Sequence, residues 1–229
     1  MQQIWAEMLF KEVLYLIQKD LVLEWRQKYA FNGMLLYVSS TVFVCYLSFG
    51  LRSNVLTVPV WNAVLWIILL FTSVNAIAKS FMQENRGRLL YFYSIVSPQG
   101  VILAKIVYNA LLMLILAVIC FVFYAFVLGN PVQDVPMFLL SILLGAIGFS
   151  TSLTMISGIA SKAANSSTLM AVLSFPVIVP MLLMLIKMSK NAIDGLDRST
   201  SFDELLTLLA INMIVVTVSY ILFPYLWRS

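Results

Sequence analysis

Histidine is absent from this chain of 229 residues, and only 10% of its residues are charged. The absence of histidine removes the commonest metal ligand, the usual axial ligand of haem iron and the usual general base at neutral pH. An ordinary soluble domain carries about 25% charged residues, so this chain has too few to cover a surface that faces water. The composition therefore excludes a soluble globular protein and leaves little for catalysis.

The cysteines and the basic residues do not point to a ligand either. Cys45 and Cys120 lie in apolar runs far apart in the sequence, where small core residues are common. The net charge of +4 comes from basic residues spread along the chain, and not clustered with aromatic residues as on a nucleic-acid-binding face. We therefore expect no metal site, no cofactor bound by this chain and no nucleic acid partner.

Apolar residues make up 62% of the chain and gather in six uncharged runs of 23 to 28 residues. Each run exceeds the roughly 20 residues that cross the hydrocarbon core as a helix, the form that satisfies its own backbone hydrogen bonds there. The sequence therefore predicts an all-α integral membrane protein of one domain, residues 1–229. Its six transmembrane helices are expected near residues 31–50, 58–78, 106–128, 136–159, 167–186 and 205–226.

The positive charges predict how these helices are oriented. With the N-terminus inside the cell, ten Lys and Arg residues lie on the cytoplasmic side and four on the outer side. Cytoplasmic loops of membrane proteins carry the excess of Lys and Arg. We therefore expect both termini in the cytoplasm.

Residues 1–28 precede the first span and form a different kind of element. Polar and apolar side chains separate onto two helical faces, as in an amphipathic helix at a membrane surface. The polar set is Glu7, Lys11, Glu12, Gln18 and Lys19, and the apolar set is Leu9, Val13, Leu16 and Ile17. We predict an interfacial helix in contact with membrane lipid, and no removable signal peptide, because a cleavage site of small residues is missing.

The predicted spans contain no Asp, Glu, Lys or Arg in their interiors. Proton pumps, ion-coupled carriers and intramembrane enzymes place such residues near the membrane midplane. The chain also lacks the glycine-rich loop ending in Lys and Ser or Thr that holds nucleotide phosphates. If this protein moves a substrate uphill, the energy must come from a partner.

Small and hydroxyl-bearing residues recur at helical spacing in the fourth span. They form two rows, Gly145, Gly148 and Ser152 in one, and Ser150, Thr154 and Gly158 in the other. Small residues let membrane helices approach closely, and hydroxyls can bond across the contact. Two interpretations stay open, which are helix packing and the lining of a substrate path.

The fifth span contains Pro176 and Pro180. Each proline removes one backbone hydrogen bond, so we expect a kink near the middle of this helix. The kink can serve gating or only the shape of the bundle.

The connection between the second and third spans, residues 79–105, carries Phe81, Glu84, Arg86 and Arg88. Residues 89–104 are too short and too interrupted to span, and we expect them to lie along the membrane surface, with a turn at the Ser-Pro-Gln-Gly sequence 97–100. A solvated basic loop explains the charges alone. The mixture of aromatic residues, a turn and both signs of charge is also typical of a docking surface for a cytoplasmic protein.

In this order the residues resemble a known family. The amphipathic N-terminal helix and six spans are joined by Phe-x-x-Glu at 81–84, SPQGVILAKI at 97–106, LLGAIGFS at 143–150 and the two-proline fifth span. The whole chain resembles CcmB, the cytochrome c maturation B component and haem exporter permease subunit, which is similar in build to permeases of the ABC-2 class. The family's inner loop follows Phe-x-x-acid-x-x-acid, and here Gly87 stands at the last position.

The resemblance implies partners and a cargo. It implies a cytoplasmic ABC ATPase, CcmA, that docks on the 79–105 loop and the N-terminal helix of a subunit in the bacterial inner membrane. It also implies haem-handling membrane partners, CcmC, CcmD and CcmE, with haem as cargo of the complex. Six helices are few to enclose a path, so two copies around a two-fold axis are expected.

Two other functions are compatible with the same residues. One is an ABC-2 permease for a lipid, a glycan or a drug. The other is a membrane scaffold that transports nothing and anchors an assembly. Haem-handling neighbours in the genome favour the first function, and a scaffold tolerates loss of its partner's ATP hydrolysis.

Overall fold

The structure of the chain is a computed structural model, and it describes residues 2–27, 29–50, 56–77, 96–161 and 166–228. The long elements in these ranges are all helices: α1 (Gln2–Gln27), α2 (Tyr29–Cys45), α3 (Val58–Ile77), α6 (Pro98–Leu128), α7 (Val135–Ala160), α8 (Ser166–Ile193) and α9 (Phe202–Arg228). A π-helical turn, Tyr46–Gly50, follows α2, and a 3-10 turn, Arg198–Ser201, precedes α9. The predicted all-α fold is confirmed.

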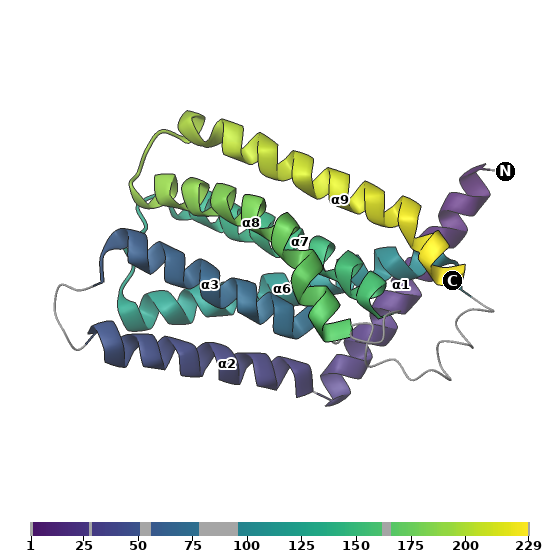
Figure 1. Cartoon of the computed structure of the whole chain (residues 1–229), viewed down its shortest axis with the longest axis horizontal. Coiled ribbons are helices and arrows are strands. Elements are labelled where there is room, and N and C mark those ends of the chain that lie inside the picture. The colour runs from purple at the N-terminus through teal and green to yellow at the C-terminus, as the bar shows by residue number, and fades with distance from the viewer. Residues whose placement is uncertain (1, 28, 51–55, 78–95, 162–165, 229) are drawn as a thin grey trace.

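Six helices within the described ranges are long and apolar enough to cross a membrane, and they are α2, α3, α6, α7, α8 and α9. They lie side by side as a bundle, and both chain ends are found at the same end of it (Figure 1). The helix α1 crosses that end obliquely. The predicted number of spans is therefore confirmed, and the chain is a multi-pass membrane protein.

The start of α6 differs from the prediction. Residues 98–105 were expected in a surface connection with a turn at 97–100, but they form the first turns of α6. Ser97 is the N-cap residue, since its Oγ accepts a hydrogen bond from the amide of Gly100, and Pro98 takes the first helical position. Both are residue types that start helices, because they satisfy or remove unpaired amides there. The expected turn is thus a helix cap.

The core of the bundle forms around α7. This helix packs against α3, α6, α8 and α9, and 72% of its membrane-spanning stretch is buried, against 17% for α9. Its own Phe138 and Phe149 are fully buried, and so are Trp61 and Trp66 of the neighbouring α3. The Trp61 ring lies 4.9 Å from the Tyr124 ring, and Trp66 lies edge-on to Phe149. α7 is therefore the central helix, and α9 is peripheral.

At the bundle end opposite the termini, polar contacts join the α6–α7 turn to the α8–α9 turn. The Nε and Nη2 groups of Arg198 donate to the two carboxylate oxygens of Asp134 at 2.8 and 3.1 Å. Asp134 also caps α7 by accepting from the amide of Met137. The hydrogen bonds from Arg198 hold the pKa of Asp134 below its usual range. The ion pair thus holds the α6–α7 turn and the α8–α9 turn together.

Candidate functional site at the junction of α1 and α6

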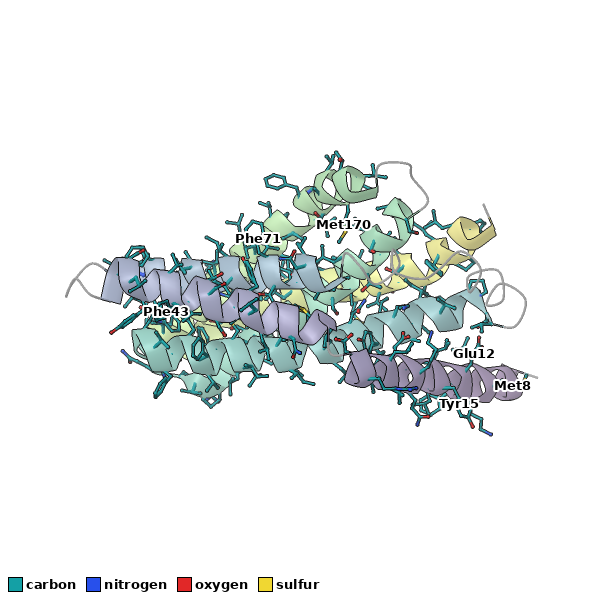
Figure 2. The ribbon with its side chains drawn as sticks, turned by 90° about the horizontal axis from the view of Figure 1, so that it is seen from below. Met8, Glu12, Tyr15, Phe43, Phe71 and Met170 are labelled. Carbon is teal, nitrogen blue, oxygen red and sulfur yellow. The ribbon has the colours of Figure 1, made fainter. Side chains whose placement is uncertain are left out.

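The first part of α6 lies beside α1 at the end of the bundle that carries both termini (Figure 2). Three acidic side chains of α1 contact α6, and each contact joins residues 84 or 85 positions apart in the chain. A nearly constant offset means that the two helices run in the same direction and keep one register. We call these contacts the acid ladder, and its members are Glu12 with Ser97, Asp20 with Lys105, and Glu24 with Tyr108.

The first contact of the acid ladder closes the N-terminus of α6. Glu12 points toward α6 (Figure 2) and accepts from the amide of Ser97 at 2.5 Å and from its Oγ at 2.9 Å. A carboxylate at a helix N-terminus is stabilised by the unpaired amides and by the helix dipole. A Cβ on Gly100 would lie 2.8 Å from Ser97 Oγ and 2.9 Å from Glu12 Cδ. A Cβ at position 100 would therefore displace the side chains of Ser97 and Glu12 from this contact.

The second contact is a buried ion pair. Lys105 Nζ lies 3.3 Å from Asp20 Oδ2, and the two side chains are only 10% and 9% exposed. Lys19, the neighbour of Asp20 on α1, reaches its other oxygen at 3.1 Å. Removing charges from water is costly, so such a pair is stable only when both charges are present. The ion pair therefore holds α1 in its position against α6.

The third contact is the weakest, and apolar packing accompanies it. The Tyr108 hydroxyl donates to Glu24 Oε2 at 3.5 Å, the upper limit for a hydrogen bond. Beside the polar contacts, Leu16 of α1 packs on a small apolar cluster of Val101, Ile102, Ile106 and Phe223. Phe223 belongs to α9, so the cluster beside α1 joins α6 to the C-terminal helix.

The predicted docking residues Phe81, Glu84, Arg86 and Arg88 lie outside the described residues. The described chain resumes at Val96, directly before the Ser97 residue that Glu12 holds. The loop after α3 therefore enters α6 at the acid ladder. The role of these four residues as an ATPase contact stays a prediction.

The two rows of small residues on α7 lie inside the bundle. Gly145 faces the ring of Trp66, and Gly148 faces Met181 and the side-chain oxygen of Asn212. Thr154 accepts from Asn109 on α6 at 2.8 Å. Gly158 and Ser152 are buried, and Ser152 Oγ has no hydrogen-bond partner within the described part of the chain. These contacts favour helix packing, while the lining of a path by these rows stays a prediction.

The packing interpretation gives a stability prediction at Gly145. An added Cβ would lie 2.7 Å from Trp66 Cζ3, and Trp66 cannot move freely because its Nε1 donates to Ser189 at 2.8 Å. Overpacking of this kind costs about 1–3 kcal/mol, so we expect Gly145→Ala to lower the thermal unfolding midpoint in detergent by roughly 5 °C. Gly33→Ala is the matched control, because nothing lies within 4 Å of a Cβ there. Equal midpoints for the two variants would contradict the close contact.

Both predicted kink residues, Pro176 and Pro180, lie inside α8, which the structure describes as one helix from Ser166 to Ile193. α8 extends seven residues beyond the expected end of the fifth span, so Lys187 and Lys190 belong to its last turns. Lys187 forms an ion pair with Glu204 at the start of α9, at 2.5 Å. A gating role for the two prolines stays a prediction.

Sequence reasoning did not find the acid ladder. It placed Lys11 and Gln18 on one helical face and Leu9, Val13, Leu16 and Ile17 on the other, and the first two are exposed while the other four are half-buried. Glu12, which was expected beside the polar face, is half-buried against Ser97. One signal was available, because acidic residues at positions 12, 20 and 24 fall on the same side of a helix.

Comparison with known proteins assigns the chain to a family. No curated protein matches it. The family model described as "CcmB protein" matches residues 11–224, which include the ladder residues of α1, the first five spans, nearly all of the sixth, and the loop between α3 and α6. The match and the six-span bundle agree, and the chain belongs to the CcmB family.

Proposed function

We propose that this chain is the membrane permease subunit of an ABC-type haem exporter complex for c-type cytochrome biogenesis. The observation that carries the proposal is the family match over nearly the whole length of a six-span bundle. The permease family is not a catalytic one, and this chain contains no nucleotide-binding loop. ATP hydrolysis is therefore assigned to a CcmA-like partner in the cytoplasm, and the complex to the bacterial inner membrane.

The acid ladder supports a route for coupling in this proposal. The ATPase docks on the 79–105 loop and on the neighbouring N-terminal helix. The described end of that loop is held by Glu12, and the same helix is joined to α6 by Asp20 and Lys105. A force on the loop is thereby passed to α6, which crosses the membrane. Two copies of the chain around a two-fold axis complete the transport unit.

Haem is proposed as cargo of the complex and not as a cofactor of this chain. The sequence has no histidine, the residue that most often ligates haem iron. CcmC, CcmD and CcmE are the proposed haem-handling partners, and they would supply the iron ligands. In this scheme ATP hydrolysis drives haem delivery or the release of the haem-loaded chaperone.

An ATPase partner that binds but does not hydrolyse ATP tests this function. With such a partner, the haem-loaded chaperone is expected to stay bound to the complex, and the yield of c-type cytochromes should fall to the level without this chain. The measurement is haem and chaperone recovered with the purified complex. Normal cytochrome yield would instead favour a scaffold, and retention of a lipid or glycan in place of haem would favour another ABC-2 cargo.

The orientation of the bundle gives a separate prediction. Cysteine labelling from the outer side should reach substitutions at Asn130 and Asn191, which lie at the bundle end opposite the termini. Labels should not reach substitutions at Asn85 or Asn165, two positions outside the described residues. The excess of basic residues on the side of the termini is the physical reason. Outer labelling at position 85 would overturn the orientation.

A further inference from the structure

Three membrane-spanning helices meet at Gly148, near the middle of α7. The helices α7, α8 and α9 pack pairwise against one another. A Cβ on Gly148 would lie 2.8 Å from Asn212 Oδ1 of α9, and it would also collide with Met181 Sδ of α8. A side chain from each neighbouring helix therefore reaches the backbone of α7 in the interior of the bundle.

Two polar atoms at this meeting point have no hydrogen-bond partner among the described residues, and they are Ser152 Oγ and Asn212 Oδ1. Both side chains lie in the interior, since Ser152 is 2% exposed and Asn212 7%. Ser152 follows Gly148 by one helical turn, about 6 Å along the same face of α7. It therefore lies on the side of α7 that Asn212 contacts, and the two unpaired atoms belong to one site.

The hydroxyl of Ser152 differs from other hydroxyls of the same helix. Ser141, Ser150 and Thr151 each donate to a carbonyl oxygen about one turn earlier in α7. Asn212 is only half satisfied, because its Nδ2 donates to a backbone carbonyl of α7 at 3.4 Å while its oxygen has no partner within the described ranges. Buried polar groups nearly always have partners, since an unpaired group loses its hydration without compensation. The site is therefore expected to bind a hydrogen-bonding molecule.

The chemistry of the site indicates water. The Ser152 hydroxyl requires an acceptor and Asn212 Oδ1 requires a donor, and one water molecule supplies both. The two groups are neutral, and α7 contains no charged residue, so the helix has nothing that would select an ion. The close contacts around Gly148 disfavour a larger ligand. Buried waters bind where polar groups otherwise lack partners.

We propose that a water molecule binds between Ser152 and Asn212 in the interior of the bundle. It accepts a hydrogen bond from the Ser152 hydroxyl and donates one to Asn212 Oδ1, and it thereby joins α7 to α9. Among the six spans α9 has the smallest buried share, 17%, so the water bridge holds the span that has the least packing of its own. The proposal depends neither on the cargo nor on the ATPase.

Radiolytic labelling of the full chain in lipid nanodiscs tests the site. An X-ray pulse converts water bound beside a side chain into hydroxyl radicals, which oxidise methionine to its sulfoxide. Met181 Sδ lies against Gly148, and Met181 is fully buried, so radicals from bulk water do not reach it. Met113 on α6 is equally buried and is the matched control. Mass spectrometry should find Met181 oxidised and Met113 unmodified, and equal oxidation of the two would overturn the proposal.

The double variant Ser152→Ala with Asn212→Leu connects the oxidation to the two polar atoms. Leucine has nearly the shape of asparagine, so the contact with Gly148 is kept while both hydrogen-bonding groups are removed. Oxidation of Met181 should then be lost. Oxidation that persists in the double variant would place the water elsewhere and overturn the assignment.

The single variant Ser152→Ala gives a measurement that does not depend on labelling. If the hydroxyl binds a water, its removal loses a hydrogen bond, and the thermal unfolding midpoint should fall by roughly 3 °C. Ser150→Ala is the matched control and should lower the midpoint less, because that hydroxyl donates to a carbonyl of its own helix. A rise of the midpoint in Ser152→Ala would show an unpaired hydroxyl and overturn the proposal. An equal fall in both variants would assign the loss to packing and would also overturn it.

Discussion

Replacement of Lys105 by methionine is expected to increase hydrogen exchange of the α1 amides about 100-fold. Lys105 and Asp20 form an ion pair whose side chains are only 10% and 9% exposed. Breaking a buried pair from one side costs about 3–5 kcal/mol, because the remaining charge stays away from water. Lys19 also contacts Asp20 and still offsets part of its charge, so we expect a cost near the lower limit. A cost of about 3 kcal/mol corresponds to a 100-fold increase in exchange.

The predicted loss of protection from hydrogen exchange is confined to α1. The ion pair joins α1 to α6 and lies at one end of the bundle, so the core around α7 keeps its contacts. Exchange should therefore rise in α1 and stay unchanged in α7. Elements with few buried contacts open independently of the global unfolding reaction, which is what residue-level exchange measures.

The double variant Asp20→Leu with Lys105→Met separates charge from packing. Removing both charges leaves no buried carboxylate at this contact, and apolar replacements of buried pairs are often neutral. We expect the double variant to exchange far more slowly than Lys105→Met alone. Lys190→Met, at an exposed lysine of α8, is the control for loss of a positive charge. If the single and double variants exchange alike, the ion pair does not hold α1.

The fold was largely predictable because membrane helices are encoded locally. A run of apolar residues longer than the hydrocarbon core must satisfy its backbone within itself, so each span is visible without its neighbours. The start of α6 was missed for an equally local reason. Ser97 and Pro98 were interpreted as a turn because the residues before them form a short interrupted run, although the same pair can cap a helix.

The acid ladder could not be derived from local patterns. Its contacts join residues 84 or 85 positions apart, and no periodicity in either helix specifies the partner. Each residue alone has a common local explanation: Asp20 is a charge on an amphipathic helix, and Lys105 is a charge at the end of a span. Only the tertiary arrangement brings them together and removes them from water.

Phe81→Ala is expected to weaken recovery of the ATPase with this chain by about 30-fold. Phe81 is an aromatic residue among charges in a loop proposed to face the cytoplasm, where exposure to water is unfavourable. Buried aromatic residues at interfaces lose about 2 kcal/mol or more on truncation, which corresponds to that factor. Glu84→Gln should have a smaller effect that fades at high salt, because charges at the rim of an interface act mainly on association.

Phe71→Ala is the matched control for Phe81→Ala. Phe71 lies on α3, shortly before the loop, and is 51% exposed on a membrane-spanning helix. Its truncation removes the same side chain from a surface that the ATPase does not reach, so recovery of the partner should not change. The measurement is ATPase recovered per membrane-inserted chain, at equal levels of the variants.

Comparing Phe81→Ala with Lys105→Met shows whether the ATPase binds to the loop or to α1. If the ATPase contacts α1 and not the loop, Phe81→Ala will retain the partner fully, and Lys105→Met, which frees α1 from α6, will release it. If the loop is the contact, Phe81→Ala will release the ATPase from a chain whose α1 exchanges normally. In that case Lys105→Met should keep the ATPase bound and lose coupling, because the loop enters α6 at Ser97 but α1 no longer holds that end of the helix. The two variants thus separate binding of the ATPase from the coupling of its movement to α6.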